Sequence, residues 1–556
     1  MAGVMFESGK WDHRTVTLAE MDNNSPASPA TSDAPLYDLV VVGGGINGVG
    51  IAADAAGRGL RVLLCEQHDL AAHTSSASSK LIHGGLRYLE QGEFRLVREA
   101  LAEREILLAK APHIVRPLRF VLPLRPQLRP AWLIRAGLFL YDRLSARGQL
   151  PASHAVRFTA DSPLKPEIRR GFEYADCQVD DARLVLLNAM AARERGATIC
   201  PRTRCLSAQR QQGLWQIELQ RADGQRSSVR ARALVNATGP WVTRFIEDAL
   251  HQRPPHHIRL VQGSHLIAPR LYEGDEAYIL QNEDRRIVFV IPYLQRYSLI
   301  GTTDREFAGD PAQVAIGETE IDYLLRAVNA HFKRPLQRSD IRHSFSGVRP
   351  LLDDESHDPA AITRDYSLSL SAEQGQAALL SVFGGKLTTY RRLAEAALEQ
   401  LAPFLPPMKP SWTAGTALPG GEELDDPDVL AGDLLQEFTW LPDGLAQRWA
   451  HTYGSRAYRL LEGASQPAHL GEHLGGGLYG REVDYLCREE WAEQAEDILW
   501  RRTKLGLLLP PAAQRRLAEY LSERPAIRQR TTTAGPGPSP DAGCADTAAL
   551  PPAAAP

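Results

Sequence analysis

Three glycines near the start of the chain have the spacing that lets a polypeptide backbone approach a phosphate group. Gly43, Gly45 and Gly48 form the pattern GxGxxG in the segment GGGINGVG, which follows the apolar run YDLVVV. The first glycine of such a pattern allows a tight turn, the second allows a pyrophosphate to come close, and the third allows a helix to pack on a strand. The N–H groups at the helix start then bind the phosphate. The pattern predicts a dinucleotide site, to which we also assign Asn47.

The elements that must position these glycines are a strand, a helix and a second strand. Residues 37–42 are β-branched and aliphatic and predict a buried strand, whereas the alanine-rich residues 46–56 predict a helix. Residues 61–65 predict a second strand that ends at Glu66, where an acidic residue accepts hydrogen bonds from an adenosine ribose. The alternative is a glycine-rich turn without a ligand, and the unit alone does not distinguish FAD from NAD.

Two later segments indicate a flavin. Residues 233–242, ALVNATGPWV, predict a strand that would bring Gly239 to the same crevice. Residues 379–398 predict a strand, a glycine turn at Gly385 and a helix, whose N–H groups and Lys386 could face the electron-rich O2 edge of a flavin. Three separated segments that converge on one cofactor are typical of a flavoprotein. We therefore predict FAD as the cofactor.

Composition limits the classes of function that remain. The chain has 556 residues and is 44% hydrophobic, which predicts a large core divided into two or three domains. Its net charge of −4 gives no general attraction for nucleic acid. Six cysteines without a CxxC pair disfavour zinc sites and a disulfide framework, and they suit a reducing cytosol. The sequence has no uninterrupted apolar run of about 18 residues, so we do not expect a transmembrane helix.

The expected fold is α/β, with a Rossmann-like FAD-binding domain, a mixed or antiparallel sheet in a substrate domain, and a C-terminal helical cap domain. Both ends of the sequence are polar or of low complexity and are expected to be disordered. The expected divisions are a disordered extension at 1–35, the FAD-binding domain at 36–240 completed by 341–402, the substrate-binding domain at 241–340, the helical domain at 403–530 and a disordered tail at 531–556.

Further motifs make the prediction more specific. The segments TSSASSKLIHGGLRYLE, ILQNEDRRIVFVIPY, IGTTD, SGVRPL and VFGGKLTTYR follow one another in this order. Together with the glycine segment they resemble the aerobic FAD-dependent glycerol-3-phosphate dehydrogenases, from about residue 37 to about residue 509. The resemblance implies oxidation of sn-glycerol 3-phosphate to dihydroxyacetone phosphate, with a hydride passing from C2 to flavin N5 and electrons to a quinone. A glycerol-3-phosphate oxidase that uses O2 shares all these motifs, and a flavin-binding protein without turnover is a third alternative.

The implied reaction needs cations for a phosphate and a base for a hydroxyl. By resemblance, Arg87, Tyr88, Arg349 and Arg364 form the substrate-binding group; the alternative role of Arg349 is to polarise the substrate oxygen. His265 lies in a predicted strand and is the candidate base, because an unperturbed imidazole is largely neutral near pH 7. The alternative for His265 is a hydrogen-bonded core residue.

The remaining assignments concern the cofactor and the competing base. His83 competes with His265 as the base, or packs beside the flavin. With His265 and Arg349, Lys386 completes the predicted catalytic set. A hydroxyl-rich loop follows the second strand and is expected to bind FAD phosphates and ribityl. The predicted cofactor contacts outside the glycine motif are Glu66, Thr74, Ser75, Ser79, Lys80, His83, Gly239, Gly385, Lys386, Leu387 and Thr388.

Residues 106–141 combine Lys110 and five arginines with many apolar side chains and no acid. Such a stretch can settle on an anionic membrane, where each basic charge adds about 1 kcal/mol. The alternative is that the apolar residues are core and the arginines pair with acids elsewhere. Because quinone dissolves in the bilayer, we expect an enzyme of the cytoplasm that associates peripherally with the cytoplasmic face of the inner membrane.

Beyond Pro410 the sequence carries few strand signals and predicts helices, including one at 492–509. Trp500, Arg501 and Arg502 within it either support a homodimer or pack inside the chain. The expected partners are therefore sn-glycerol 3-phosphate, a membrane quinone, an anionic membrane surface and a second copy of the chain.

Overall fold

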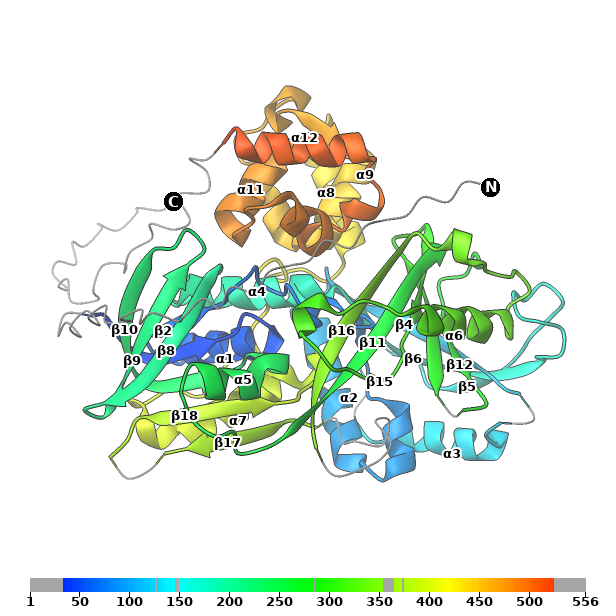
Figure 1. Cartoon of the computed structure of the whole chain (residues 1–556). Helices are drawn as coiled ribbons and strands as arrows, with labels where there is room; N and C mark the ends of the chain where they lie inside the picture. The colour runs from blue at the N-terminus through cyan, green and yellow to red at the C-terminus, as the bar shows by residue number, and fades with distance from the viewer. Residues whose placement is uncertain are drawn as a thin grey trace, which may run out of the picture. The chain divides into compact units, whose positions relative to one another are not determined.

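The computed structural model describes residues 34–524, except 126–127, 146–147, 149, 285, 354–364 and 373–374. Of Arg87 and Gln91 it describes the backbone only. The predicted disordered segments lie outside the described residues, apart from the last positions of 1–35. The described chain folds around two β-sheets and a C-terminal group of helices (Figure 1).

The first sheet has eight strands and a parallel centre. β1 (Leu36–Val42) lies between β2 (Val62–Cys65) and β10 (Arg226–Asn236), and β10 pairs in parallel with β18 (Ala378–Phe383). Parallel strands are buried on both faces, which explains why β1 and β2 are nearly continuous aliphatic runs. The outer strands are β7 (Thr198–Cys200), β8 (Thr203–Gln211), β9 (Leu214–Arg221) and β17 (Ser367–Ser371).

Helices cover one face of this sheet. α1 (Ile46–Gly57), α4 (Asp181–Glu194) and α7 (Tyr390–Leu401) share one hydrophobic core with Val41 of β1. The adjacent Val40 points to the other face, where β8, β9 and α5 (Val242–Asp248) close a second core. Because β1, β2, β10 and β18 are parallel, their carboxyl ends meet along one edge of the sheet.

The second sheet has ten strands, and β4 with β12 forms its one parallel pair among the described strands. The mixed α/β fold that we predict, with a largely antiparallel second sheet, is confirmed. The strands are β3 (Leu81–Ile82), β4 (Val115–Pro123), β5 (His154–Arg157), β6 (Arg170–Val179), β11 (Ile258–Pro269), β12 (Ala277–Gln281), β13 (Ile287–Tyr293), β14 (Tyr297–Gly301), β15 (Arg305–Glu306) and β16 (His343–Leu352).

This sheet extends beyond the residues 241–340 expected for the substrate domain. Strands β3, β4, β5 and β6 precede that range, and β16 follows it. β16 pairs with β11 over its whole length, and β4 joins β12 in parallel. Local sequence does not specify such long-range pairing, which explains why the sheet extends beyond the expected range. The domain boundaries remain a prediction. α6 (Glu318–Asn329) packs on one side of the sheet, whereas α2 (Phe94–Lys110) and α3 (Ala131–Tyr141) pack on the other.

The C-terminal helices share a core of their own around Trp449 and Leu486. The predicted helix at 492–509 is replaced by a π-helix at Asp497–Arg502 and a 3₁₀ turn at Leu505–Leu507, because Lys504 adopts a left-handed backbone with φ of 58°. The regular helices are α8 (Pro427–Glu437), α9 (Asp443–Tyr453), α10 (Ala457–Leu461), α11 (Gly480–Glu490) and α12 (Pro511–Ser522), beside the short strands β19 (His473–Gly475) and β20 (Leu478–Tyr479).

Buried ion pairs connect this helical region to the loop after β2 and to α4, and Figure 1 shows the helical region beside α4. Arg501 and Arg502 both bind Asp69, and Arg183 on α4 binds Glu490. The two arginines therefore pack inside the chain, while the homodimer remains a prediction. Within the described part of the chain, each helix falls short of the length and apolarity that a bilayer crossing requires.

Candidate active site

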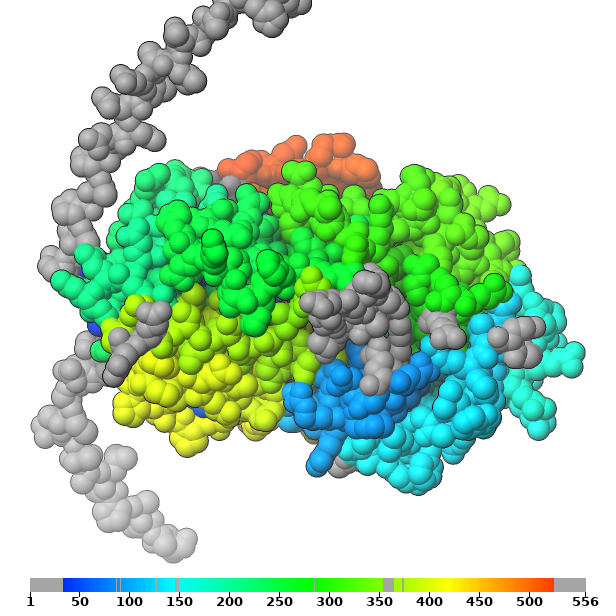
Figure 2. Space-filling model, turned by 60° about the horizontal axis from the view of Figure 1, so that its bottom comes forward, coloured from blue at the N-terminus to red at the C-terminus, as the bar shows by residue number. Residues whose placement is uncertain are grey.

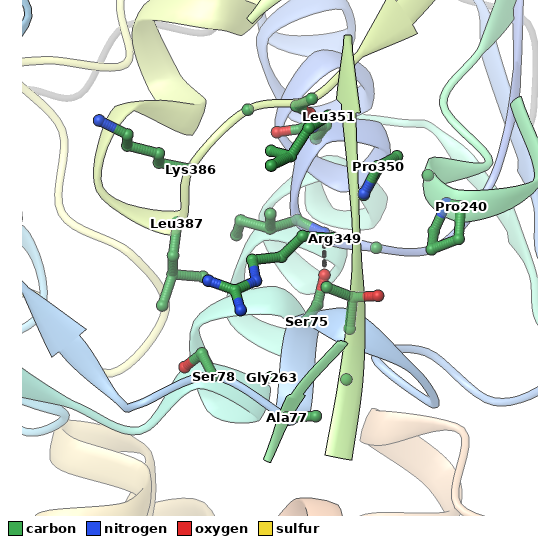
Figure 3. A pocket seen from close by; sticks show the side chains of 18 of the residues that line it. Ser75, Ala77, Ser78, Pro240, Gly263, Arg349, Pro350, Leu351, Lys386 and Leu387 are labelled. Atoms are coloured by element: carbon green, nitrogen blue, oxygen red, sulfur yellow. Dashed lines mark hydrogen bonds between the residues drawn. The ribbon is translucent and has the colours of Figure 1, made fainter. Parts of the chain in front are cut away.

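A cavity of about 970 Å³ lies along the carboxyl edge of the first sheet and continues between that edge and the second sheet. Its lining includes the glycine turn after β1, the loop after β2, the turn after β18, and residues of β11, β13 and β16. Figure 3 shows part of this lining, with Ser75, Ser78, Arg349 and Lys386 grouped around the cavity. The three segments that we predict to meet at a cofactor therefore line one cavity.

The glycine turn leaves no room for side chains where it contacts the rest of the sheet. Gly43 has φ of 116°, and a Cβ there would lie 2.4 Å from the Ala237 carbonyl oxygen. At Gly48 a Cβ would lie 1.9 Å from the carbonyl oxygen of Gly43. Gly45 immediately precedes α1. The first N–H of this helix, that of Ile46, donates to Ser75 Oγ at 3.0 Å, and Figure 3 draws a hydrogen bond to Ser75 as a dashed line. This packing matches the positions that a pyrophosphate-binding turn requires.

Glu66 lies where the second strand ends, as expected. Its carboxylate accepts from the N–H of Gly44 at 2.7 Å and from the N–H of His68 at 2.8 Å. Burial raises the pKa of Glu66, and the two backbone hydrogen bonds oppose this rise. Thr74 in the following loop donates to the Val348 carbonyl oxygen at 2.7 Å, which ties the loop to β16.

The turn after β18 meets the start of α1. Gly384 and Gly385 have φ of 73° and 99°, a conformation that favours glycine. Asn47 donates from Nδ2 to the Gly384 carbonyl oxygen at 3.1 Å. Lys386, Leu387 and Thr388 follow and line the cavity, as do Gly239 and His83. Asn47 therefore joins two of the predicted cofactor segments directly.

Arg349 extends from β16 into the cavity, towards the turn that carries Leu387 (Figure 3). Its guanidinium forms an ion pair with Asp304 at 2.8 Å and donates to the Thr303 carbonyl oxygen at 2.9 Å. The side chain retains 24% exposure, so the group is held and still accessible. Asp304 belongs to the IGTTD segment, but sequence reasoning did not assign it a role, because nothing local shows that it faces an arginine 45 residues away.

His265 lies on β11 and is 2% exposed. Its ring stacks on Phe345, with centroids 4.9 Å apart and planes inclined by 19°. On Gly301 a Cβ would come within 2.2 Å of His265 Cδ2, so only glycine leaves the imidazole this space. Burial, followed by the positive charges of Lys80 and Arg349, lowers the pKa of His265 to about 3. The imidazole is therefore neutral at ordinary pH.

Lys386 and Tyr88 form a second group at the cavity. The Lys386 ammonium lies 3.7 Å from the centroid of the Tyr88 ring, an arrangement that favours a cation–π contact. His83 packs edge-on against Phe289 at 6.3 Å, and its N–H donates to Thr388 Oγ1 at 3.4 Å. His83 and Tyr88 come from the motif HGGLRYLE, and Lys386 and Thr388 from the motif FGGKLTTYR, about 300 residues away in the sequence.

Three predicted site residues stand apart from this set. The Arg87 side chain and all of Arg364 lie outside the described residues. Lys80 is not among the described residues that line the cavity, because its ammonium turns inward and donates to Asp181 Oδ1 at 2.7 Å. A contact between Lys80 and the cofactor remains a prediction.

The residues present fit a bound FAD. The glycine turn and helix start suit a pyrophosphate, Glu66 suits a ribose, and the cavity continues from there to Lys386 and His265. Nδ1 of the buried His265 has no hydrogen-bond partner among the described residues, as expected at a site that binds a polar ligand.

Comparison with known proteins agrees with this geometry. Residues 38–391 match the family described as FAD dependent oxidoreductase, and residues 411–523 match the C-terminal domain of alpha-glycerophosphate oxidase. A glycerol-3-phosphate dehydrogenase of Pseudomonas aeruginosa is 68% identical over 507 residues, which cover 91% of this chain and 99% of that protein. The aerobic glycerol-3-phosphate dehydrogenase of Escherichia coli is 57% identical over 487 residues, which cover 87% of this chain and 97% of that protein.

A solved structure gives the same result for the fold. The glycerol-3-phosphate dehydrogenase of Bacillus halodurans, complexed with FAD, superposes with a TM-score of 0.67 at 27% identity and covers 89% of this chain and 93% of its own. The predicted cofactor, FAD, and the predicted enzyme class are thereby confirmed. The chain belongs to the FAD-dependent oxidoreductases and, within them, to the glycerol-3-phosphate dehydrogenase family.

Proposed function

We propose that the protein oxidises the C2 hydroxyl of sn-glycerol 3-phosphate to a ketone, giving dihydroxyacetone phosphate, and passes the electrons to a membrane quinone. The observation that carries this proposal is the meeting of a held arginine, Arg349, and a neutral buried histidine, His265, in the cavity that fits FAD. The names of the close relatives support the same substrate. Bound FAD would supply the two-electron acceptor, with N5 of its ring as the proposed acceptor of the C2 hydride.

Arg349 binds the phosphate or polarises the reacting oxygen. A guanidinium presents N–H groups in a fixed fork that suits phosphate oxygens, and such charge-assisted hydrogen bonds are among the strongest in proteins. Asp304 and the Thr303 carbonyl fix the orientation of this fork before substrate arrives. Arg87, Tyr88 and Arg364 complete the proposed substrate-binding group.

His265 accepts the proton of the C2 hydroxyl. A base must be unprotonated, and the buried imidazole meets this condition, while the same lowering of its pKa makes the ring a weaker proton acceptor. The ring stacks on the aromatic face of Phe345, and the absence of a side chain at Gly301 leaves the space that it needs in this plane. His83, in the same cavity lining, remains the alternative base.

Lys386 places a positive charge beside the turn that ends β18, at the start of the 3₁₀ turn Leu387–Thr389. N–H groups at a helix start and a lysine side chain both favour negative charge. We assign Lys386 to the electron-rich edge of the bound ring system, with Tyr88 holding its ammonium in place.

The route to quinone runs towards α3. Apolar side chains of α2, α3 and the 3₁₀ segment Leu86–Gln91 line one end of the cavity: Leu86, Leu89, Phe94, Leu133, Ile134 and Leu140. α3 also leaves Trp132 71% exposed and Phe139 51% exposed, while Ile134, Leu138 and Tyr141 face the core. Figures 1 and 2 show α2 and α3 side by side on one face of the molecule.

We therefore assign membrane contact to α3 and not to the whole stretch 106–141. Lys110 in this stretch is buried and donates to the Thr413 carbonyl oxygen, and β4 forms part of the second sheet. Arg135 on α3 retains an exposed side chain beside Trp132 in the sequence. Aromatic and basic side chains on one helix suit an anionic membrane surface, and they support the proposal of an enzyme that associates peripherally with the cytoplasmic face of the inner membrane.

The electron acceptor is tested by separating the two half-reactions. The protein is first reduced anaerobically with glycerol 3-phosphate and then mixed with a quinone analogue or with O2. The proposal predicts fast reoxidation by the quinone and slow reoxidation by O2, with little hydrogen peroxide. Fast reoxidation by O2 with one peroxide per substrate would instead identify an oxidase, to which the match of residues 411–523 also points.

A further inference from the structure

A buried carboxylate at the start of α4 reaches the loop that touches the proposed base. Asp181 is fully buried, and its side chain contacts two residues of the segment Ser78–Lys80. Ser78 donates to Asp181 Oδ2 at 2.7 Å, and Lys80 donates to Asp181 Oδ1 at 2.7 Å. The carboxylate therefore holds both neighbours of Ser79.

Ser79, between these two anchored residues, contacts His265 directly. Its Oγ lies 2.9 Å from Nε2 of the imidazole, and this is the ring's one hydrogen bond to the described residues. The other ring contacts are the stacked face of Phe345 and the close approach of Gly301, where a Cβ would lie 2.2 Å from His265 Cδ2. Those contacts fix the plane of the ring. The hydroxyl of Ser79 selects which edge of the ring faces the loop and whether Nε2 carries the proton.

The backbone conformation of the segment Ser78–Lys80 is one that its side-chain contacts must hold in place. Lys80 has φ of 60°, which is unfavourable for a residue with a Cβ. Its ammonium also donates to the Ser76 carbonyl oxygen at 2.9 Å and lies 5.2 Å from the centroid of Phe345, the ring that stacks on His265. One cation thus contacts the loop, the carboxylate and the aromatic neighbour of the base.

We propose that Ser79, clamped between Ser78 and Lys80 by the buried carboxylate of Asp181, is a positioning residue that orients the imidazole of His265. The inference rests on the proposed role of His265 as the base. It gives the Ser79 hydroxyl a partner other than the cofactor contact that the sequence predicts, and it gives Asp181 a role that the sequence does not predict.

The test compares Ser79→Ala, Asp181→Asn and the double variant by anaerobic stopped-flow with glycerol 3-phosphate. Each single variant should retain FAD and the wild-type affinity for substrate, while flavin reduction slows about tenfold, the effect of one lost hydrogen bond. Because Asp181 acts through Ser79, the double variant should be no slower than Ser79→Ala alone. Ser79→Thr, which keeps a hydroxyl, should recover most of the rate.

A pH profile separates positioning from simple loss of structure. In Ser79→Ala the pH at which reduction loses half its maximal rate should shift by up to about one unit, since the hydrogen bond to Nε2 is lost. A purely structural role would lower the melting temperature and leave this pH unchanged, which would overturn the proposal. A double variant whose loss in the rate of flavin reduction is the product of the two single losses would also overturn the proposal. If Asp181→Asn does not fold, Ser79→Ala alone decides the question.

The neighbouring carboxylate provides a matched control. Asp180 caps the start of the same helix, where it accepts from the Arg183 N–H at 3.0 Å and pairs with Lys504 of the C-terminal region. Asp180→Asn should retain the wild-type rate of flavin reduction. If it slows reduction as much as Asp181→Asn does, the effect belongs to the helix start in general and the clamp is wrong.

His265→Asn distinguishes failure of this inference from failure of the proposed base. Slow reduction in His265→Asn with normal reduction in Ser79→Ala would leave the base in place and reject the positioning role. Normal reduction in His265→Asn would reject both.

Discussion

The two ends of the cavity are built in different ways. The dinucleotide end consists mainly of backbone: Gly43, Gly45 and Gly48, with the carboxylate of Glu66, all within one strand–helix–strand unit. The substrate end consists of side chains from distant elements, including His265 of β11 and Arg349 of β16. The dinucleotide end depends on the absence of side chains from the glycine turn, whereas the substrate end depends on the placement of a few functional groups.

This difference has a consequence for mutation. Adding atoms at the dinucleotide end should remove the cofactor and with it all activity, because the backbone there has no space to relax. Removing atoms at the substrate end should leave a yellow, folded protein with a specific kinetic defect. The variants below test this division in order of expected effect.

Gly48→Val should have the largest effect. A Cβ at this position would lie 1.9 Å from the Gly43 carbonyl oxygen, so the turn and α1 cannot both keep their places. We expect purified protein without bound flavin and without measurable activity, as read from its visible absorption. Gly432→Ala in α8 is the control, since a Cβ there meets nothing within 4 Å, and it should retain full flavin content. A yellow Gly48→Val protein would contradict the role of close packing in this turn.

His265→Asn should retain FAD and substrate affinity but slow flavin reduction by about 10² to 10⁴, the usual contribution of a general base. Stopped-flow measurement under anaerobic conditions gives this rate directly. A normal rate in a stable variant would move the assignment to His83. A loss of flavin would instead show that the histidine is part of the structural core.

The same histidine predicts how stability depends on pH. Its pKa is about 3 in the folded protein and about 6.5 when exposed, so the unfolded chain binds the proton more readily as the pH falls below 6.5. The stability that the neutral buried ring provides is present above pH 6.5 and is lost on acidification. As the pH falls from 6.5 towards 3, the free energy of unfolding of His265→Asn should decrease less than that of wild type, by up to about 1.4 kcal/mol per pH unit. Equal slopes of melting temperature against pH in both proteins would contradict the lowered pKa.

Arg349→Ala should have a smaller effect than removal of the base. One charge-assisted interaction contributes about 1.5 to 3 kcal/mol, which corresponds to a fall of about tenfold to a hundredfold in kcat/KM for glycerol 3-phosphate. The control is Arg338→Ala, which removes surface pairs with Glu318 and Asp322 and should leave kcat/KM unchanged. If Arg349→Ala and wild type share the same kcat/KM, the phosphate site lies elsewhere.

Changes on α3 should have the smallest effect on the chemistry. Trp132→Glu with Phe139→Glu should weaken sedimentation with anionic vesicles several-fold, because two exposed aromatic side chains leave the proposed membrane surface. Flavin reduction by substrate in solution should not change. Val429→Glu, at a residue of α8 that is 62% exposed, is the matched control and should bind vesicles normally. Undiminished vesicle binding of the α3 variant would exclude this helix as the contact.

The sequence predicts the dinucleotide end well for a physical reason. The strand, turn, helix and acid are consecutive in the chain, so their local patterns contain the information that the fold uses, and β1, α1 and β2 lie within one or two residues of their predicted bounds. The substrate end required resemblance to a known family, since no local pattern shows that Arg349 and His265 share a cavity. The partners of those groups escaped prediction altogether: Asp304 beside Arg349, Ser79 beside His265, and the inward turn of Lys80 to Asp181.

Anaerobic addition of glycerol 3-phosphate to the purified yellow protein tests the central claim most directly. We expect the visible flavin absorption to bleach within the mixing time of an ordinary spectrophotometer, with one dihydroxyacetone phosphate formed per flavin reduced. Glycerol at the same concentration should leave the spectrum unchanged, because it lacks the phosphate that Arg349 is proposed to bind. An unchanged spectrum with glycerol 3-phosphate, or equal bleaching by both compounds, would contradict the proposed function.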